Sequence, residues 1–438
     1  SMVATDLSDV LFGTPAPARA QVNLGVLSED QVNIVVHGHE PTLSEMILAA
    51  ASDPEMVDYA RSKGASGIRL AGICCTSNEV LMRQGVPSAG NFLNQELAIL
   101  TGAVEAMVVD VQCIMQALAP LSQRFHTQLI TTSPKVRIED ATHIEFEEHR
   151  AMEIARRIVR SAVDAYPSRD GASIPSISEH LIGGFSHEYL NYMLGGRYRT
   201  SFRPLNDAVM RGRIRGVAGV VGCNNPRVTQ DETNTYVVQK LIENDVLVAQ
   251  TGCGALGSAK YGLLRPETAL EKAGPGLREV CEAIGIPPVL HLGSCVDNSR
   301  ILTVLSQMAS QGGLGEDISD LPAVGIAPEW MSEKALAIGA YFVASGAYVM
   351  FGVRSPVEAS PDVTRLISEG WEEKTGGKLE FVLDPTEMVR RALDHIDSKR
   401  ALLGLAEYDP KRFGQSGDAR LANFESLSME ERMRRMYG

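Results

Sequence analysis

The sequence predicts an α/β protein with two Rossmann-like, doubly wound parallel-sheet domains and a metal site between them. Short apolar runs alternate with segments of helical period. Several of these runs break at a turn and present a cysteine or histidine. The alternation restarts near residue 214, so we expect domains at 1–214 and 215–438. A chain of 438 residues is long enough for two cores.

The order of elements follows from these patterns. Residues 1–30 show no regular period and are expected to form an extended lead-in. Expected strands are 32–39, 67–75, 107–113, 128–132, 217–221, 246–250, 289–292, 348–352 and 379–383. Expected helices are 46–63, 78–83, 93–100, 147–165, 188–194, 234–242, 276–284, 300–311, 332–343 and 386–396.

Two of these helices carry strong local signals. Residues 42–45 resemble a capping box that opens the helix 46–63, and Gly64 supplies its stop. The helix 147–165 has an apolar stripe at helical spacing, formed by Ile154, Ala155, Ile158, Val159 and Ala162. Both helices should therefore pack one face against a sheet.

Charge and hydropathy limit the class of protein. There are 41 Lys+Arg and 54 Asp+Glu residues, so the net charge is 41 − 54 = −13, and no long block has one sign. This argues against a surface for nucleic acid or anionic membrane. No apolar run approaches the roughly 20 residues of a membrane span, and no signal core follows a basic N-terminus. We expect a cytoplasmic protein that acts on small molecules.

Six ligand-type residues stand at the ends of six predicted strands. Seven cysteines without any Cys-x-x-Cys pair do not fit a disulfide framework, a zinc ribbon or a thioredoxin motif. The carboxyl ends of parallel strands gather ligands, so one shared site is expected. The candidate ligands are His37 or His39, Cys75, Cys113, Cys223, Cys253 and Cys295.

This ligand set is too large for structural zinc, which takes four ligands. Thiolate-rich sets suit an iron–sulfur cluster, with room for a second thiophilic metal such as nickel or copper. A single buried cysteine is more often an inert core thiol, but five at equivalent positions argue against chance. Cys281 lies on the apolar stripe of a helix and is interpreted as core, and Cys74 should point away from Cys75 by strand alternation.

A competing interpretation is nucleotide binding at residues 252–257, which fit G-x-G-x-x-G after a strand. It is weakened because Arg265-Pro266 leaves little room for a full helix, and because Glu267 does not end a second strand. Close backbone approach to an inorganic cluster explains the glycines equally well.

Seven motifs are spread along the chain: His37-Gly38-His39-Glu40-Pro41, Gly72-Ile73-Cys74-Cys75, Asp110-Val111-Gln112-Cys113, Gly222-Cys223-Asn224-Asn225, Thr251-Gly252-Cys253-Gly254, Gly293-Ser294-Cys295-Val296-Asp297-Asn298 and the run 327–334, Ala-Pro-Glu-Trp-Met-Ser-Glu-Lys. Together they resemble the anaerobic nickel–iron carbon monoxide dehydrogenases along nearly the whole chain. The resemblance implies a nickel–iron–sulfur cluster that interconverts CO and water with CO2, two protons and two electrons.

The resemblance also implies a role for each residue, and it favours His39 over His37. Lys334 would stabilise the developing carboxylate oxygen or move protons, although a lone helix lysine is more often solvated. Ile338, one turn further on, would shield the nickel pocket. The metal ligands implied are His39 and Cys75 for a pendant iron, Cys113, Cys223 and Cys253 for three cubane irons, and Cys295 for nickel.

The sequence departs from the family in one respect. Family members carry an N-terminal helical domain with electron-transfer clusters and a proton-transfer histidine, and no such segment precedes residue 1. We therefore expect a minimal or truncated form that passes electrons to a redox partner protein, with a homodimer left open. Two alternatives stand beside it. One is a cluster-binding or metal-handling module without turnover, and the other is a hybrid-cluster reductase of nitrogen oxides, which the Ser-Cys-Val-Asp-Asn run at 294–298 disfavours.

Overall fold

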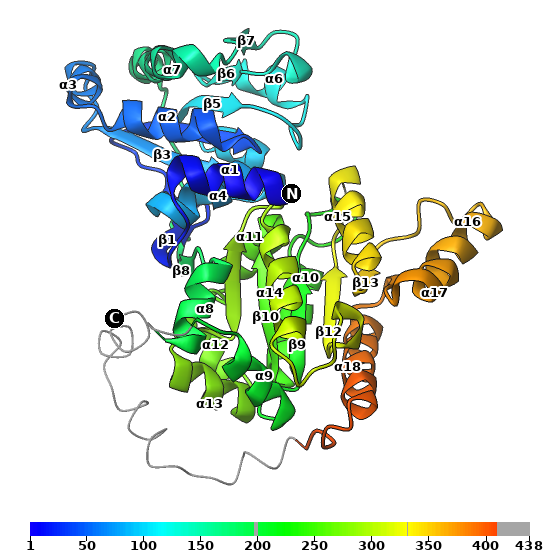
Figure 1. Ribbon diagram of the computed structural model, residues 1–438. Coiled ribbons are helices and arrows are strands. Elements are labelled where there is room, and N and C mark those ends of the chain that lie inside the picture. The colour runs from blue at the N-terminus through cyan, green and yellow to red at the C-terminus, as the bar shows by residue number, and fades with distance from the viewer. Residues whose placement is uncertain (197–199, 331, 410–438) are drawn as a thin grey trace. The chain divides into compact units, whose positions relative to one another are not determined.

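The chain forms two compact units in a computed structural model that describes residues 1–196, 200–330 and 332–409 (Figure 1). The N-terminal unit is Val3–Gly184. The C-terminal unit begins at Phe185 and also includes Ser1–Met2. Each unit is built on one sheet of mainly or wholly parallel strands, which confirms the predicted α/β class.

Eight strands form one sheet in the N-terminal unit, all of whose residues the structure describes. Its spatial order is β7-β6-β5-β2-β3-β4-β1-β8, and the pairs are parallel except for the antiparallel edge pair β1/β8. The strands are β1 Ala18–Val22, β2 Val32–Gly38, β3 Ile68–Ile73, β4 Ser88–Gly90, β5 Val104–Val109, β6 Gln128–Thr131, β7 Thr142–His143 and β8 Glu179–Gly183. The central strand β2 is buried along its whole length, as expected for a sheet covered on both faces.

The core of this unit lies between the central strands and helices α2 and α7. The apolar stripe predicted for 147–165 is confirmed, because Ile154, Ile158 and Ala162 of α7 are buried. The helix begins later than expected because a 3-10 turn precedes it. The helices are α1 Met2–Phe12, α2 Pro41–Ala51, α3 Pro54–Ser62, α4 Cys74–Gln84, α5 Gln95–Leu100, α6 Leu118–Ser122 and α7 Ala151–Ala165.

The expected extended lead-in is wrong, because residues 1–30 contain α1 and β1. Helix α1 turns its polar side inward: Thr5 and Ser8 are buried, whereas Val3, Leu7 and Val10 are exposed. A helix with this inverted arrangement does not show the usual pattern of a buried apolar stripe. The ion pair between Arg83 of α4 and Asp9, at 2.8 Å, attaches α1 to its unit.

In the described part of the C-terminal unit, six strands form a second sheet, and every pair is parallel. The order is β11-β10-β9-β12-β13-β14. The strands are β9 Gly216–Val220, β10 Val246–Thr251, β11 Val289–Gly293, β12 Ala323–Ala327, β13 Tyr348–Phe351 and β14 Lys378–Phe381. The sequence reasoning missed β12, which lies between β9 and β13.

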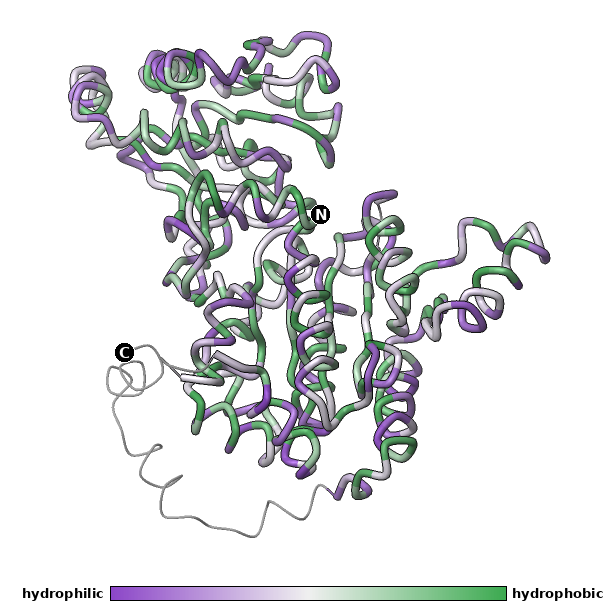
Figure 2. The backbone as a smooth tube through the Cα atoms, viewed as in Figure 1, coloured by the Kyte–Doolittle hydropathy of each residue, from purple (hydrophilic) through white to green (hydrophobic). Residues whose placement is uncertain are grey.

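Helices cover this sheet, and α18 illustrates how they do so. Its buried residues include Met388, Ala392 and Ile396, whereas many of its other positions are polar, and Figure 2 shows both purple and green segments along it. The helices are α8 His187–Gly195, α9 Arg203–Met210, α10 Glu232–Glu243, α11 Gly252–Lys260, α12 Pro266–Lys272, α13 Pro275–Ile284, α14 Asn298–Ser310, α15 Glu333–Ala344, α16 Pro361–Arg365, α17 Trp371–Thr375 and α18 Pro385–Leu402. A single π-helical turn, Leu366–Gly370, lies between α16 and α17.

The boundary between the units falls before residue 214, at Gly184/Phe185. Helices α8 and α9 belong to the C-terminal unit because they pack on α14. The amide of Asn191 donates to Gln307 Oε1 at 2.7 Å, and that of Asn206 donates to the Met308 carbonyl at 2.8 Å. The predicted second domain also included 410–438, which lie outside the described residues.

Each sheet reverses its strand order at one place. In the N-terminal sheet this switch lies between β2 and β5, and in the C-terminal sheet it lies between β9 and β12. Doubly wound sheets bind ligands at such a switch, outside the carboxyl ends of the strands. A ligand site is therefore expected in the segments that follow these four strands.

Among the described residues, no helix is both long and apolar enough to cross a membrane.

Candidate metal centre

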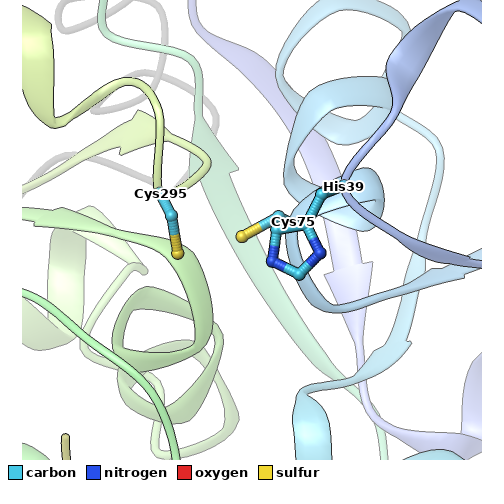
Figure 3. A group of neighbouring side chains, drawn as sticks. All are labelled: His39, Cys75 and Cys295. Atoms are coloured by element: carbon cyan, nitrogen blue, oxygen red, sulfur yellow. The ribbon is translucent and has the colours of Figure 1, made fainter. Parts of the chain in front are cut away.

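Three predicted ligands of the N-terminal unit meet at its switch point. His37 pairs with Ile73 of β3 and with Val109 of β5, so β3, β2 and β5 end level with one another. The segments that leave these strands carry Cys75, in the first turn of α4, and His39 and Cys113, in loops. The sulfur of Cys113 lies 3.8 Å from Nε2 of His39. Cys75 and His39 have ligand atoms within 4.8 Å and lie side by side in Figure 3.

The surroundings of the two histidines support His39 as the ligand. Nδ1 of His39 donates to the Val111 carbonyl at 2.9 Å, which leaves the Nε2 lone pair available for a metal. His37 is fully buried in β2, where its Nε2 lies 3.1 Å from both Gln95 Oε1 and the Cys113 carbonyl. Burial lowers the pKa of His37 to about 4, so its ring is neutral and serves the core.

The ligand turns hold strained backbone. Cys74, Gln112 and Cys113 have φ of 62°, 60° and 58°, a left-handed conformation that residues other than glycine rarely adopt. Cys74 opens helix α4 and is not part of a strand, so the expectation that strand alternation separates it from Cys75 is wrong. Both cysteines are buried, and the left-handed turn at Cys74 lies directly between β3 and Cys75.

A buried carboxylate, Asp110, lies among these turns. It accepts hydrogen bonds from the backbone N–H of His39 at 2.6 Å and from the hydroxyl of Thr76 at 2.9 Å. Burial raises the pKa of Asp110 to about 6, although the N–H groups of His39 and Val111 favour its charged form. Sequence reasoning quoted this residue in a motif but gave it no role.

The other three predicted ligands lie in the C-terminal unit, again after parallel strands. Cys223 follows β9, and Cys253 is the second residue of α11 directly after β10. Cys295, labelled in Figure 3, follows β11. Burial and then the charges of Cys295 and Cys253 raise the pKa of Cys223 to about 11. Cys223 and Cys295 also line the same cavity of this unit. A thiol with a raised pKa, such as that of Cys223, loses its proton readily only to a bound cation.

A glycine permits the close approach of two of these segments. Gly252 has φ of +62°, and a Cβ at this position would lie 2.8 Å from the sulfur of Cys295. The missing side chain thus leaves space around that sulfur. The three sulfurs of the C-terminal unit, and separately the imidazole and two sulfurs of the N-terminal unit, are donors of the kind that iron and nickel in sulfide clusters take.

The segment after β12 contributes Ser332, Lys334 and Ile338. The hydroxyl of Ser332 lies 3.4 Å from the sulfur of Cys223 and also caps helix α15. Lys334 is half-buried in the first turn of α15. Ile338 is buried and lines an apolar cavity of this unit together with Cys223, Cys295 and Ser332. Met331, also part of the quoted run, lies outside the described residues.

A second buried carboxylate, Glu329, ties this segment to its neighbours. Its oxygens accept from the backbone N–H of Asn234 at 3.1 Å and of Asp231 at 3.2 Å. The amide of Asn224, next to Cys223, reaches the same carboxylate at 3.4 Å. Sequence reasoning assigned no role to Glu329 or Asp110. The signal for Asp110 was an acidic residue directly after the apolar run 107–109, whereas the strand before Glu329, β12, was not predicted.

Comparison with known proteins identifies the family. A family model described as the Prismane/CO dehydrogenase family matches residues 1–386. The chain belongs to this family. The predicted resemblance is thereby confirmed.

Several relatives within the Prismane/CO dehydrogenase family are close in sequence and structure. Carbon monoxide dehydrogenase 1 of Methanosarcina mazei is 53% identical over 407 residues, which cover 92% of this chain and 64% of that protein. Carbon monoxide dehydrogenase 2 of Carboxydothermus hydrogenoformans is 42% identical over 414 residues, with the same two coverages. The chain thus spans 64% of the length of these curated relatives.

Solved structures agree with this assignment. A nickel-free structure of carbon monoxide dehydrogenase from Thermococcus sp. AM4 has a TM-score of 0.89 and 51% identity, and the match covers 92% of this chain and 63% of that one. Carbon monoxide dehydrogenase IV from Carboxydothermus hydrogenoformans has the same TM-score at 47% identity, covering 92% and 65%.

The glycine pattern at 252–257 has a packing explanation in this fold. The predicted lack of room for a helix is wrong, since α11 starts at Gly252. Instead, a Cβ at Gly257 would lie 2.6 Å from Asp231 Oδ1, and one at Gly254 would lie 3.0 Å from Asn234 Oδ1. The glycines therefore let α11 approach the start of α10 closely.

Cys281 occupies the position that its helical stripe predicts. It is fully buried in α13, and burial raises the pKa of its thiol well above the ordinary value. A thiol of this kind is inert packing material.

Proposed function

We propose that the chain is a carbon monoxide dehydrogenase-type oxidoreductase that interconverts CO and water with CO2, two protons and two electrons at a nickel–iron–sulfur cluster. The observation that carries the proposal is the pair of three-ligand sets, each at the switch point or strand ends of a doubly wound sheet. Membership of the Prismane/CO dehydrogenase family and the names of the relatives support it.

The proposed ligand roles use the six residues in two groups. The N-terminal unit supplies His39 and Cys75 to a pendant iron and Cys113 to a cubane iron. The C-terminal unit supplies Cys223 and Cys253 to the other two cubane irons and Cys295 to nickel. The bound cluster would supply the site where carbon is held and the store for two electrons.

The protein's own residues would prepare this site. The Val111 carbonyl fixes the tautomer of His39 so that Nε2 faces the metal. Lys334, half-buried at the start of α15, would place a positive charge where negative charge develops on the substrate oxygens. Ile338 and the apolar lining of the cavity would exclude water beside Cys295.

Electrons must leave the site after each turnover, and we assign this step to a redox partner protein. A small viologen dye can replace that partner in the assay, so the test does not depend on its identity. The homodimer stays a prediction, which the native mass of the protein tests.

The test is anaerobic reconstitution with iron, sulfide and nickel, followed by CO-driven viologen reduction. We expect about one nickel per roughly four irons. Cys295→Ala should lose nickel and activity, whereas Cys281→Ala, a buried cysteine in α13, should keep both. Full metal loading without a response to CO would leave a cluster-binding module, and reduction of hydroxylamine in its place would indicate a hybrid-cluster reductase.

A further inference from the structure

Asp110 occupies a central position in the N-terminal sheet. It is the first residue after β5, and its N–H donates to the His37 carbonyl of β2 at 3.1 Å. The residue is 6% exposed. Its side chain therefore stands at the switch point, inside the protein, where β5 and β2 end.

The Asp110 carboxylate contacts all three segments that carry predicted ligands in this unit. Oδ1 accepts the backbone N–H of His39 at 2.6 Å and also the N–H of the residue after Asp110, which leads to Cys113. Oδ2 accepts the hydroxyl of Thr76 at 2.9 Å, and Thr76 directly follows Cys75 in α4. One side chain thus joins turns that are far apart in the sequence.

The backbone opposite Asp110 is shaped to admit the carboxylate. A Cβ at Gly38 would lie 1.9 Å from Asp110 Oδ1, so any other residue would displace it. Gly38 also has φ of +135°, which favours glycine. The pairing of Gly38 with Asp110 is therefore a specific fit at the His39 turn.

We propose that Asp110 is a positioning residue whose carboxylate holds the turns of His39, Cys75 and Cys113 in the arrangement that binds iron. Burying a carboxylate costs free energy, and in a loop that did not have to hold metal ligands the backbone N–H groups could form hydrogen bonds with water instead. Residues behind metal ligands typically change metal affinity 10–100-fold when removed. This inference rests on the proposed function, because it concerns the same site.

The test measures how fast iron is lost from the reconstituted full chain to a chelator. Asp110→Ala should lose iron about 10–100-fold faster than the wild type. Asp110→Asn should rescue retention to within about fivefold, because its oxygen still accepts both N–H groups and Thr76 can accept from the new amide. Thr76→Val removes one hydrogen bond and keeps the carboxylate, so its rate of iron loss should lie between those of Asp110→Asn and Asp110→Ala.

The matched control is Asp245→Ala in the C-terminal unit. Asp245 is also buried, at 0% exposure, and its carboxylate accepts the backbone N–H of Leu277 at 2.7 Å and the hydroxyl of Tyr408, neither of which lies in a segment that carries a predicted ligand. Its iron loss should match the wild type. Equal iron loss from Asp110→Ala and Asp245→Ala, or iron retention in Asp110→Ala that matches the wild type, would overturn this inference and leave the proposed function standing. If Asp110→Ala does not fold, unchanged retention in Thr76→Val overturns it. A wild-type chain that takes up no iron would overturn the proposed function as well.

Discussion

Replacing Gly252 by alanine tests whether Cys295 binds a metal. Gly252 opens α11 with φ of +62°, and the added Cβ would lie 2.8 Å from the sulfur of Cys295. Ordinary contact begins at 3.4 Å, so the sulfur must move by 3.4 − 2.8 = 0.6 Å. Metal–ligand distances vary by only about 0.2 Å, so the displaced sulfur should no longer reach its metal.

The control separates this effect from backbone strain. Gly262 has φ of +75°, and its added Cβ would approach only Thr268, at 3.8 Å. Alanine at either glycine costs about 1–2 kcal/mol of folding free energy because of the left-handed backbone. The Gly252→Ala variant should in addition retain nickel about 10–100-fold less well, as expected when one ligand is misplaced.

The assay is the nickel and iron content of anaerobically reconstituted chains, with urea unfolding of the metal-free chains beside it. Both variants should unfold at similar urea concentrations, and only Gly252→Ala should lose nickel while keeping most of its iron. Wild-type nickel content in Gly252→Ala, or equal nickel loss in Gly262→Ala, would refute the reasoning.

Three further predictions concern residues around the site and the C-terminal sheet. Ser332→Ala removes a hydrogen bond to the Cys223 sulfur, so a redox titration should show a more negative potential of the loaded cluster; an unchanged potential contradicts this. Glu329→Ala leaves two buried N–H groups without their acceptor and should lower the unfolding free energy in urea by about 2–4 kcal/mol, whereas a loss under about 1 kcal/mol would argue against its role. Burial lowers the pKa of His395 to about 4, below its ordinary 6.5. The folded chain therefore binds this proton less readily than the unfolded chain, so the stability linked to His395 is fully present above pH 6.5 and declines as the pH falls toward 4. In His395→Phe the decline between about pH 6.5 and 4.5 should be smaller by about 1–2 kcal/mol, allowing for partial exposure, and an identical pH profile would contradict the assignment. The groups that face this imidazole are Lys378, Lys399, Glu380 and Tyr348.

The spacing of apolar residues predicted much of the fold, because the positions that are buried in a helix or strand are the ones that are apolar. The stripe of α7 and the apolar runs of β2 and β10 pack as their spacing indicates. Helix α1 was missed because its apolar side faces outward. The sequence predicted a boundary at residue 214 because α8 and α9 come before β9, the first strand of the C-terminal sheet. Only the packing of α8 and α9 on α14 assigns these two helices to the C-terminal unit.

The sequence predicted those parts of the candidate site in which a ligand-type residue comes close after a strand. The prediction of ligands rested on cysteines and a histidine at the ends of predicted strands, and in the structure these residues do follow parallel strands of the two sheets; their binding of metal stays a prediction. The support for those ligands was not predictable, because it comes from distant residues. Asp110 is 71 residues from His39, and Glu329 is 105 residues from Asn224. No local pattern reports such contacts, although the motif did favour His39 over His37.

The proposed function requires this chain to oxidise CO at a cluster held by these six ligands. It is tested by the CO2 formed from CO, under anaerobic conditions, by the reconstituted wild-type chain with methyl viologen as electron acceptor. We expect one CO2 for every two one-electron reductions of the dye, and neither product in Cys295→Ala. A fully loaded wild-type chain that forms no CO2, or equal CO2 formation by Cys295→Ala, would show that the proposed function is wrong.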